Sequence, residues 1–591
     1  MLESSYMKIY RYALLLLTIL SACSGSVTTE RLPTPYELGN GNQTATYEET
    51  IRWWRQLEEA SPYVKLLEAG KTDSGEPLHL VVVNKRANFN LESLKERKRP
   101  LLLINNGIHP GEPDGVDASM LYIRKLLQDE KEQGILDEVI IAVIPMFNIG
   151  GSLNRNCCSR ANQNGPEAYG FRGNARNLDL NRDFIKADSR NAQSFIQLVS
   201  ALDPDVYLET HVSNGADYPY TLTYLYAHHA KQTPPLDSFV YEEFELPIKA
   251  HFDSIGDHII PYVNVFGTTP DSGYTAFYDS PRYSTGFLSL RHTIALLTET
   301  HMLKPYSARV RMTEQFMHTL TQRIAKLGDA ILEARADADR FMLQQQRFAL
   351  AHVTNRKAAD SLLFKGYEAR YDSSVVTGLP QLSYNPASPW ERKIPYYNQL
   401  TPTTTVQAPL YYVIPTAWHE VIERLKWNGV VLVALDRDTQ MTVSQYRILD
   451  FETVETPYEG HYLHSKTSVV AEPIVRRFHK GSYVLASTDQ RMKRFLIETL
   501  EPSAPDAYFN WNFYDEILQQ KEWFSSYVFE PEAVEMLKDP EHRKAFEQFL
   551  MEHPEHAENA FAQLYFLYKR SPHFEVDRFM IYPVFRIDET N

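Results

Sequence analysis

The sequence predicts an α/β fold, a mixed, mainly parallel sheet flanked by helices, on two observations. First, five short segments are continuously hydrophobic rather than alternating, which is typical of strands buried on both faces. They are LHLVVV (78–83), PLLLINN (100–106), VIIAVIPMFN (139–148), VYLETHV (206–212) and IALLTETHML (294–303). Second, amphipathic segments separate these runs, as expected for helices that cover a sheet.

Length and charge limit the possible classes of protein. The 591 residues exceed what one hydrophobic core organises, so we expect two domains. A hydrophobic content of 43% with 23% charged residues is globular composition. The net charge of -15 argues against a nucleic-acid partner, because phosphate binding needs a basic face.

The N-terminus resembles an export signal. Basic residues from Met7 precede an apolar run, and the segment ends in LSAC at Cys23. This ending resembles the lipobox of bacterial lipoproteins, which implies a lipid on Cys23 and a membrane-anchored, exported protein of the cell envelope. Residues 1–23 are thus predicted to be a lipoprotein signal peptide. The alternative is an ordinary cleaved signal peptide. Residues 24–45 are rich in Ser, Thr, Gly and Pro, and we predict a tether there.

The rest of the chain divides into a first domain (46–310), a helical connector (311–365) and an α+β accessory domain (366–591). Phe316, Leu320, Ile324, Leu327 and Ile331 recur at helical spacing, which predicts a long helix continuing to about residue 360. The last region opens with a strand, helix, strand pattern from residue 408 and is predicted to end in helices (540–553 and 557–570).

Only two cysteines follow the N-terminal segment. Cys157 and Cys158 are adjacent, and neighbouring cysteines are an unfavourable pair for a structural bridge. We therefore predict no disulfide framework.

Polar side chains gather where the hydrophobic runs end. His109 and Glu112 follow the run 100–106, in a loop with prolines and glycines. His211 ends the run 206–212, and Glu299 lies in the last run. Ligands of open α/β sheets bind beyond the carboxyl ends of the strands, so we expect these side chains to meet. An isolated HxxE pair would be weak evidence for a metal site.

At these residues the sequence resembles the zinc carboxypeptidases of the carboxypeptidase A family. The resemblance covers about residues 46–310 and implies one catalytic zinc ion, with His109, Glu112 and His211 as ligands. Two imidazoles and a carboxylate leave the fourth zinc position for water. Zinc lowers the pKa of that water and polarises a substrate carbonyl.

The segment RGNARNLDLNRDF extends the resemblance. It implies that Asp179 orients His109 and that Asn181 and Arg182 hold the terminal carboxylate of the substrate. Arg172 would polarise the scissile carbonyl and stabilise the oxyanion. Asn177 stands where the family usually has glycine. The alternatives for the oxyanion arginine are Arg176, Arg160 and Arg155.

Two further roles follow from the resemblance. Glu299 matches the general base, which takes a proton from the attacking water and passes it to the leaving amine. The competing interpretation is an ion pair between Glu299 and Arg291. Tyr283, in PRYSTGF, matches the substrate-side tyrosine, with Tyr274 and Tyr278 as alternatives.

Other polar residues near these motifs have plainer interpretations. Glu209 and His301 are expected to face away from the metal, to pack, or to support the ligands from behind. His228 and His229 form a second metal site or, as we favour, part of a surface loop. Asp114 is expected to orient its loop by hydrogen bonding.

The sequence thus predicts a zinc-dependent metallocarboxypeptidase that acts on a peptide or peptide-like substrate with a free carboxylate. The alternatives are an amidase or deacylase acting on cell-wall peptides or acylated amino acids, and a non-catalytic peptide-binding lipoprotein. The largely apolar segment 284–295 favours a neutral substrate side chain, whereas Arg291 within it would favour an acidic one.

Overall fold

The structure, a computed structural model, describes residues 32–589 and divides into two compact units. The first unit continues to Thr405 and includes residues 427–429 and 491–495. The second unit contains the remaining described residues. The first unit therefore extends beyond residue 366, where the sequence placed the start of the accessory domain.

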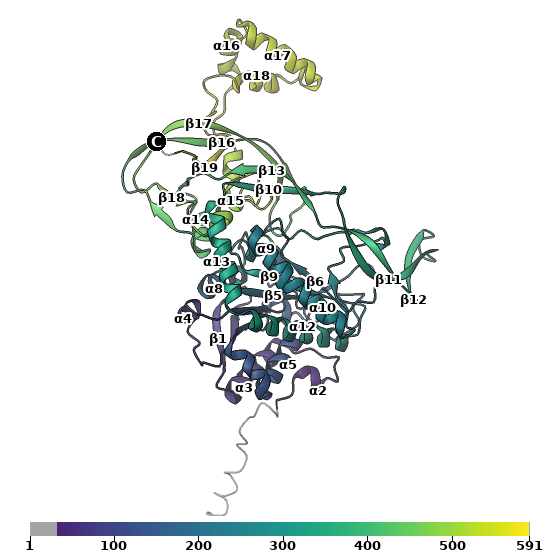
Figure 1. The fold of residues 1–591 in the computed structure, drawn as a ribbon. Coiled ribbons are helices and arrows are strands. Elements are labelled where there is room, and N and C mark those ends of the chain that lie inside the picture. The colour runs from purple at the N-terminus through teal and green to yellow at the C-terminus, as the bar shows by residue number, and fades with distance from the viewer. Residues whose placement is uncertain (1–31, 590–591) are drawn as a thin grey trace, which may run out of the picture. The chain divides into compact units, whose positions relative to one another are not determined.

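The first unit is built on an eight-stranded mixed sheet in the order β1-β2-β4-β3-β5-β9-β6-β7 (Figure 1). Its central strands β4, β3, β5 and β9 are parallel neighbours, and antiparallel strands lie on both sides of them. The predicted fold class is confirmed. The strands are β1 (Val64–Lys71), β2 (Pro77–Val83), β3 (Leu101–Asn105), β4 (Ile140–Ile144), β5 (Val206–Ser213), β6 (Leu222–Tyr226), β7 (Ile260–Pro261) and β9 (Ile294–His301).

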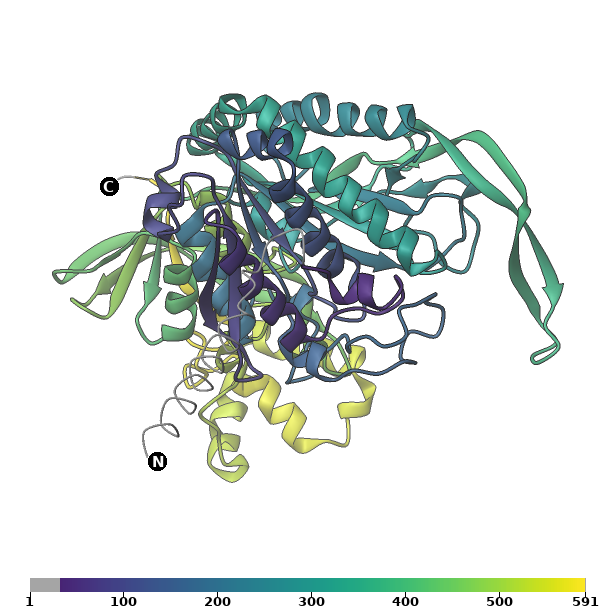
Figure 2. The same ribbon diagram turned by 90° about the horizontal axis from the view of Figure 1, so that it is seen from below.

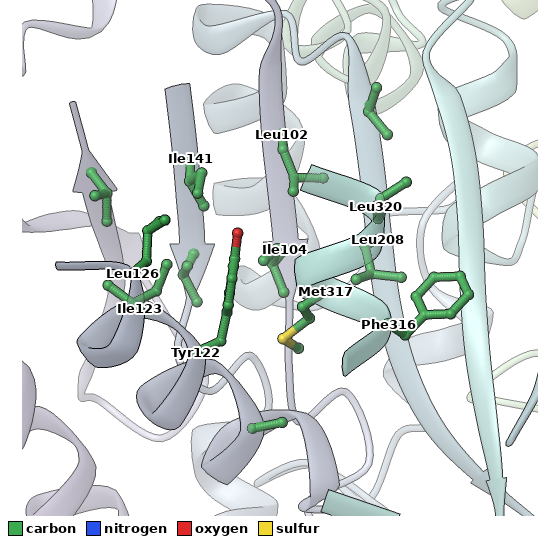
Figure 3. Close-up of a cluster of buried hydrophobic side chains, with 14 of the residues drawn as sticks. Leu102, Ile104, Tyr122, Ile123, Leu126, Ile141, Leu208, Phe316, Met317 and Leu320 are labelled. Carbon is green, nitrogen blue, oxygen red and sulfur yellow. The ribbon is translucent and has the colours of Figure 1, made fainter. Parts of the chain in front are cut away.

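Helices cover both faces of this sheet. On one face, α5 (Asp114–Gln128) and α12 (Tyr306–Leu327) pack their apolar sides against the central strands (Figure 3). On the other, Phe195 of α8 (Arg190–Leu202) packs edge to face with Tyr207 of β5. The central strands are buried on both faces, as their continuous hydrophobic runs require. The residues labelled in the close-up are Leu102, Ile104, Tyr122, Ile123, Leu126, Ile141, Leu208, Phe316, Met317 and Leu320.

Shorter elements complete the first unit. Helices are α2 (Pro35–Leu38), α3 (Tyr47–Ala60), α4 (Leu91–Lys95), α6 (Glu130–Gln133), η2 (Gly134–Asp137), α7 (Ile149–Leu153), η3 (Leu180–Arg182), α9 (Pro234–Val240), η4 (Tyr241–Glu245), α10 (Leu246–Ser254), η5 (Pro270–Ser272), α11 (Ser284–Ser289) and α13 (Asp329–Gln344). Strands are β8 (Tyr274–Thr275), β10 (Arg347–Thr354), β11 (Asp360–Ser373), β12 (Pro380–Tyr397) and β13 (Leu400–Gln407).

The predicted connector differs from the structure in two respects. Gly328, with φ of 48°, separates α12 from α13, and the helix expected to reach residue 360 ends at Gln344. The hairpin β11–β12 (Figure 2) belongs to the first unit, because β12 pairs with β8 and the side chains of Phe364 and Ile394 pack against Tyr218 and its neighbours.

Part of the predicted tether is packed rather than free. Leu32 is buried in the main core, and Arg124 donates to its carbonyl and to the carboxylate of Glu37. Cys23 lies outside the described residues, so the lipid anchor and the exported location stay predictions. No helix among residues 32–589 has the length and apolar character needed to cross a membrane.

The second unit contains a six-stranded sheet in the order β15-β18-β14-β19-β16-β17. Its strands are β14 (Tyr411–Pro415), β15 (Leu432–Ala434), β16 (Thr439–Thr453), β17 (His464–Phe478), β18 (Tyr483–Ser487) and β19 (Ile581–Ile587). The helices of this part of the chain are α14 (His419–Trp427), α15 (Lys493–Leu500), η6 (Asp515–Leu518), α16 (Ser526–Met536), α17 (Pro540–Glu552), η7 (Pro554–His556) and α18 (Ala560–Tyr568).

The strand, helix, strand opening predicted for this region is confirmed by β14, α14 and β15. The two predicted helices are present as α17 and α18, but a strand follows them, so the expectation that the chain ends in helices is wrong. The last described element is β19, which pairs with β14 on one side and β16 on the other. Pro583 lies inside β19, and a proline argues against a central strand. Here the register with β16 shifts between Gln445 and Arg447, and a bulge of this kind accommodates the missing N–H.

The adjacent cysteines are bonded. The structure joins Cys157 and Cys158 by a disulfide, although neighbouring cysteines are an unfavourable pair for a structural bridge. A disulfide between adjacent residues joins no two secondary-structure elements, however, so it does not cross-link the fold.

One buried carboxylate makes the stability of the first unit depend on pH. Asp117 of α5 accepts hydrogen bonds from the hydroxyl of Tyr306 and the amide of Ala45, and burial raises its pKa to about 7. This pKa of the folded protein lies above the value near 3.8 that applies to the unfolded chain. The stabilisation by the buried, protonated carboxyl is therefore complete below about pH 3.8, and it is lost as the pH rises through about 7.

Asp117→Asn, which stays neutral, is expected to lose less stability than the unsubstituted protein between about pH 5 and pH 8, by on the order of a few kcal/mol. Thermal melts of both proteins at the two pH values measure the difference. Parallel pH profiles would contradict this assignment.

Candidate metal centre

Three of the predicted residues meet at one edge of the sheet. The ligand-capable atoms of His109, Glu112 and His211 all lie within 4.8 Å of one another, and the three residues are buried. His109 and Glu112 lie in the loop between β3 and α5, and His211 is near the carboxyl end of β5. Because β3 and β5 are parallel neighbours, their carboxyl ends share an edge of the sheet.

The donor atoms are arranged as a metal site requires. Nδ1 of His211 lies 2.9 Å and Nδ1 of His109 lies 3.3 Å from Oε2 of Glu112. Among the described residues, nothing hydrogen-bonds Nδ1 of His109, although this atom is buried. Burial alone would raise the pKa of Glu112, but Arg160 and His109 hold it well below its usual range, so the carboxylate is ionised. Two imidazole nitrogens and one carboxylate fit the ligand set of a catalytic zinc ion.

Asp179 holds one of these imidazoles from behind. Nε2 of His109 hydrogen-bonds Oδ1 of Asp179 at 2.8 Å. Asp179 caps η3 by accepting the amide of Asn181 at 2.9 Å, and Oδ2 accepts two hydrogen bonds from Arg172. A carboxylate on Nε2 fixes the orientation and tautomer of the ring and leaves Nδ1 to face the metal.

Two arginines border the metal centre. Nη1 of Arg172 lies 3.5 Å from Oε1 of Glu112, and its side chain is 45% exposed. Arg160 donates from Nη1 to the same oxygen at 2.8 Å and from Nη2 to the carbonyl of Val212. Gly111 makes room for it, since a Cβ there would lie 2.8 Å from Cδ of Arg160.

The other two alternatives for the oxyanion arginine lie elsewhere. Arg176 donates to the carbonyl of Asp188, and Arg155 donates to the carbonyls of Thr44, Ala45 and Ala168. Neither lines the pocket around the metal centre. Arg172 and Arg160 therefore remain as candidates to meet a developing oxyanion.

Glu299 lies beside the candidate ligands. It is in register with His211 across the parallel strands β9 and β5. Burial raises the pKa of the Glu299 carboxyl to about 8. Nothing among the described residues hydrogen-bonds its Oε2, and Arg291 donates instead to Ser200 and Asn428. The contacts thus give no support to a Glu299–Arg291 ion pair.

A cavity of about 550 Å³ joins these groups. Tyr283, at the start of α11, lines it, and the guanidinium carbon of Arg182 lies 4.4 Å from the centre of the Tyr283 ring. Tyr274 donates to the carbonyl of Pro261 and, like Tyr278, does not line the cavity. The predicted site residues that line the cavity are His109, Glu112, Arg172, Asn181, Arg182, His211, Tyr283 and Glu299.

The apolar wall of the cavity was not predicted. Leu225 of β6 and Leu297 of β9 are register partners, and both line it together with Tyr262 and Phe277. The parity of the strand could have identified Leu297, because residues two apart in a strand share a face and Glu299 faces the cavity. No sequence signal placed Leu225 opposite it.

Glu209 and His301 have different surroundings. Glu209 is buried on the same face of β5 as His211, and one of its carboxylate oxygens contacts Nε2 of that ring. It therefore does not face away from the candidate ligands, since residues two apart in a strand share a face. His301 hydrogen-bonds the carbonyl of Ala216 and does not line the cavity.

The remaining expectations concern residues beyond the cavity. His228 and His229 belong to neither of the candidate metal groups found among residues 32–589. Asp114 accepts a hydrogen bond from the hydroxyl of Thr300 and pairs with Arg309, and it thereby fixes the start of α5.

Comparisons with known proteins agree with this site. A family model described as "Zinc carboxypeptidase" matches residues 50–212, a span that contains all three candidate ligands. Carboxypeptidase 2 of Trichophyton rubrum is 20% identical over 488 residues, covering 79% of this chain and 84% of that protein.

Two solved structures are also similar. A metallo-carboxypeptidase from Burkholderia cenocepacia (14% identity, 48% of this chain and 70% of that chain) and the carboxypeptidase A from Helicoverpa armigera (15%, 56% and 81%) each have a TM-score of 0.37. The family match and the curated relative together support the resemblance of the first unit to zinc carboxypeptidases.

Proposed function

We propose that the first unit is a zinc-dependent metallocarboxypeptidase, which hydrolyses the C-terminal amide bond of a peptide. One observation carries the proposal: two histidines and a glutamate converge within 4.8 Å in a cavity that also contains a carboxyl with a raised pKa and three arginines. The zinc ligands would be His109, Glu112 and His211, and the metal would lower the pKa of a water molecule and polarise the scissile carbonyl.

The residues of this chain would divide the remaining chemistry. Glu299 would accept a proton from the attacking water and pass it to the leaving amine, from its place in the cavity beside the candidate ligands. Arg172 presents fixed positive charge to the oxygen that becomes negative in the transition state. Asp179 holds both Arg172 and His109 in place.

The substrate carboxylate would be held by Asn181 and Arg182. Both line the cavity, and the planar guanidinium of Arg182 matches the geometry of a carboxylate. Tyr283 stacks on this guanidinium and limits its movement. The apolar wall formed by Leu225 and Leu297 supports a neutral, apolar C-terminal side chain, and the placement of Arg291 outside the cavity speaks against an acidic one.

The function is tested with paired peptides that differ only at the C-terminus. An N-acylated dipeptide with an apolar C-terminal residue and a free carboxylate is expected to be hydrolysed, and the same dipeptide with a C-terminal amide is expected to be cleaved far more slowly. Equal rates for both would contradict a carboxypeptidase. Cleavage of acylated amino acids alone would support the deacylase alternative, and zinc binding without any hydrolysis would support a binding protein.

Arg172→Ala is expected to lower kcat by about 10²–10³-fold, the usual effect of removing one oxyanion donor. Zinc content should remain at one per chain, because Asp179 still contacts His109. Steady-state kinetics with the free dipeptide measure the change. Arg176→Ala is the matched control, since Arg176 is exposed and donates to a backbone carbonyl outside the cavity. Equal kcat values for Arg172→Ala and Arg176→Ala would indicate that Arg160, and not Arg172, stabilises the oxyanion.

A further inference from the structure

Glu209 is a carboxylate with no part in the chemistry above. It lies in β5 two residues before His211, so both side chains extend from the same face of the strand. The side chain is fully buried, with an exposed fraction of 0%. Its Oε1 accepts hydrogen bonds from Nε2 of His211 and, at 2.8 Å, from Nδ2 of Asn181.

Burying a carboxylate is costly unless a positive charge or several donors compensate it. Among residues 32–589, His211 is the one ion-pair partner of Glu209, and nothing hydrogen-bonds its Oε2. Among these residues, no arginine or lysine pairs with this group. The compensation for its charge therefore comes from the amide of Asn181 and from the imidazole of His211 with whatever cation that ring binds.

The arrangement around His211 matches the arrangement around His109. In both rings Nδ1 faces Glu112, and in both Nε2 contacts a carboxylate, Asp179 for His109 and Glu209 for His211. Such a carboxylate keeps the proton on Nε2, leaves the lone pair on Nδ1 and makes the ligand more basic.

We propose that Glu209 is a positioning residue that fixes the ring of His211 for metal binding and, through the same oxygen, fixes the amide of Asn181. This inference rests on the metal site proposed above.

The contact with Asn181 adds a second consequence. Nδ2 of Asn181 donates to Glu209, and its Oδ1 accepts the amide of Ser284 at 3.2 Å, so the orientation of the amide is set. Nδ2 also lies 3.1 Å from Nε2 of His211, which cannot accept a hydrogen bond while its own proton goes to Glu209, so one Nδ2 hydrogen remains for a substrate carboxylate. Removing the carboxylate of Glu209 should therefore weaken metal binding and substrate binding together.

The test uses the full chain with Glu209→Ala and Glu209→Gln, and Glu68→Gln, an exposed position of β1, as the matched control. Each protein is stripped of metal and titrated with zinc against a chromophoric chelator. The alanine variant is expected to bind zinc about 10–100-fold more weakly, as for other residues that orient metal ligands. The glutamine variant keeps an acceptor for Nε2–H and should lose less. The control should bind as the unsubstituted protein does.

Two further readouts separate this role from general damage to the fold. The visible spectrum of the cobalt-substituted protein should change in Glu209→Ala and not in Glu68→Gln, and KM for the free dipeptide should rise. Thermal melts of the metal-free variants identify any that fail to fold, in which case Glu209→Gln decides. Zinc affinities within twofold for the unsubstituted protein and a folded Glu209→Ala variant, or for Glu209→Gln if the alanine variant does not fold, would overturn the proposal. No zinc binding by the unsubstituted protein would overturn the metal site itself.

Discussion

Glu299→Gln is expected to lower kcat/KM by about 10²–10⁴-fold, the range attributed to general acid–base groups. The amide is close in size to the carboxyl and carries no charge, but it cannot take a proton from the attacking water. Because Glu299 is not one of the three candidate ligands, zinc content should stay at one per chain. Steady-state kinetics with the free dipeptide and metal analysis of the same preparation measure both quantities.

The surroundings of Glu299 explain why a large effect is expected. The carboxyl lines the cavity beside the metal centre, and burial has raised its pKa to about 8. A partly buried acid whose Oε2 has no hydrogen-bond partner among the described residues is costly to keep without a task. Glu68→Gln, in an exposed position of β1, is the control and should leave kcat/KM unchanged. Equal activity of the two variants would exclude Glu299 as the base.

His211→Ala is expected to remove bound zinc and with it all measurable hydrolysis. Of the three candidate ligands, His211 is the one that comes from a separate strand, and its ring contacts Glu112 and Glu209 at the same time. Without the ring, two protein ligands remain, and both buried carboxylates lose a partner. Metal analysis after dialysis, together with the free-dipeptide assay, gives the result.

His251→Ala is the matched control for this substitution, because His251 is exposed on α10 and is not one of the candidate ligands. It should retain one zinc ion and full activity. One zinc ion per chain in a folded His211→Ala protein would show that the metal binds elsewhere.

The fold of the first unit could be predicted because its strands carry their own signal. Segments such as 101–104 and 140–144 are apolar at every position, and a strand covered on both faces makes such a run favourable. β19 had no such signal, since Pro583 interrupts it and its two neighbours, β14 and β16, are distant in sequence. A strand in which a bulge accommodates a proline can be recognised only from the strands with which it pairs.

The candidate site was predictable to the same degree and for a similar reason. His109, Glu112 and His211 follow or end buried strands, and the order of parallel strands brings such ends together. Arg160 could not be placed, because its contact with Glu112 depends on the path of an irregular loop. Glu209 could be assigned to the face of His211 by strand parity, but its contact with Nε2 depends on how the ring is turned.

The most direct test of the central claim is crystallography of the zinc-loaded protein with anomalous scattering measured on both sides of the zinc absorption edge. We expect one strong zinc peak in the first unit, bound by Nδ1 of His109, Nδ1 of His211 and the carboxylate of Glu112, at distances of about 2.0–2.2 Å. A peak at any other group of side chains, or none in a crystal grown with excess zinc, would contradict the account.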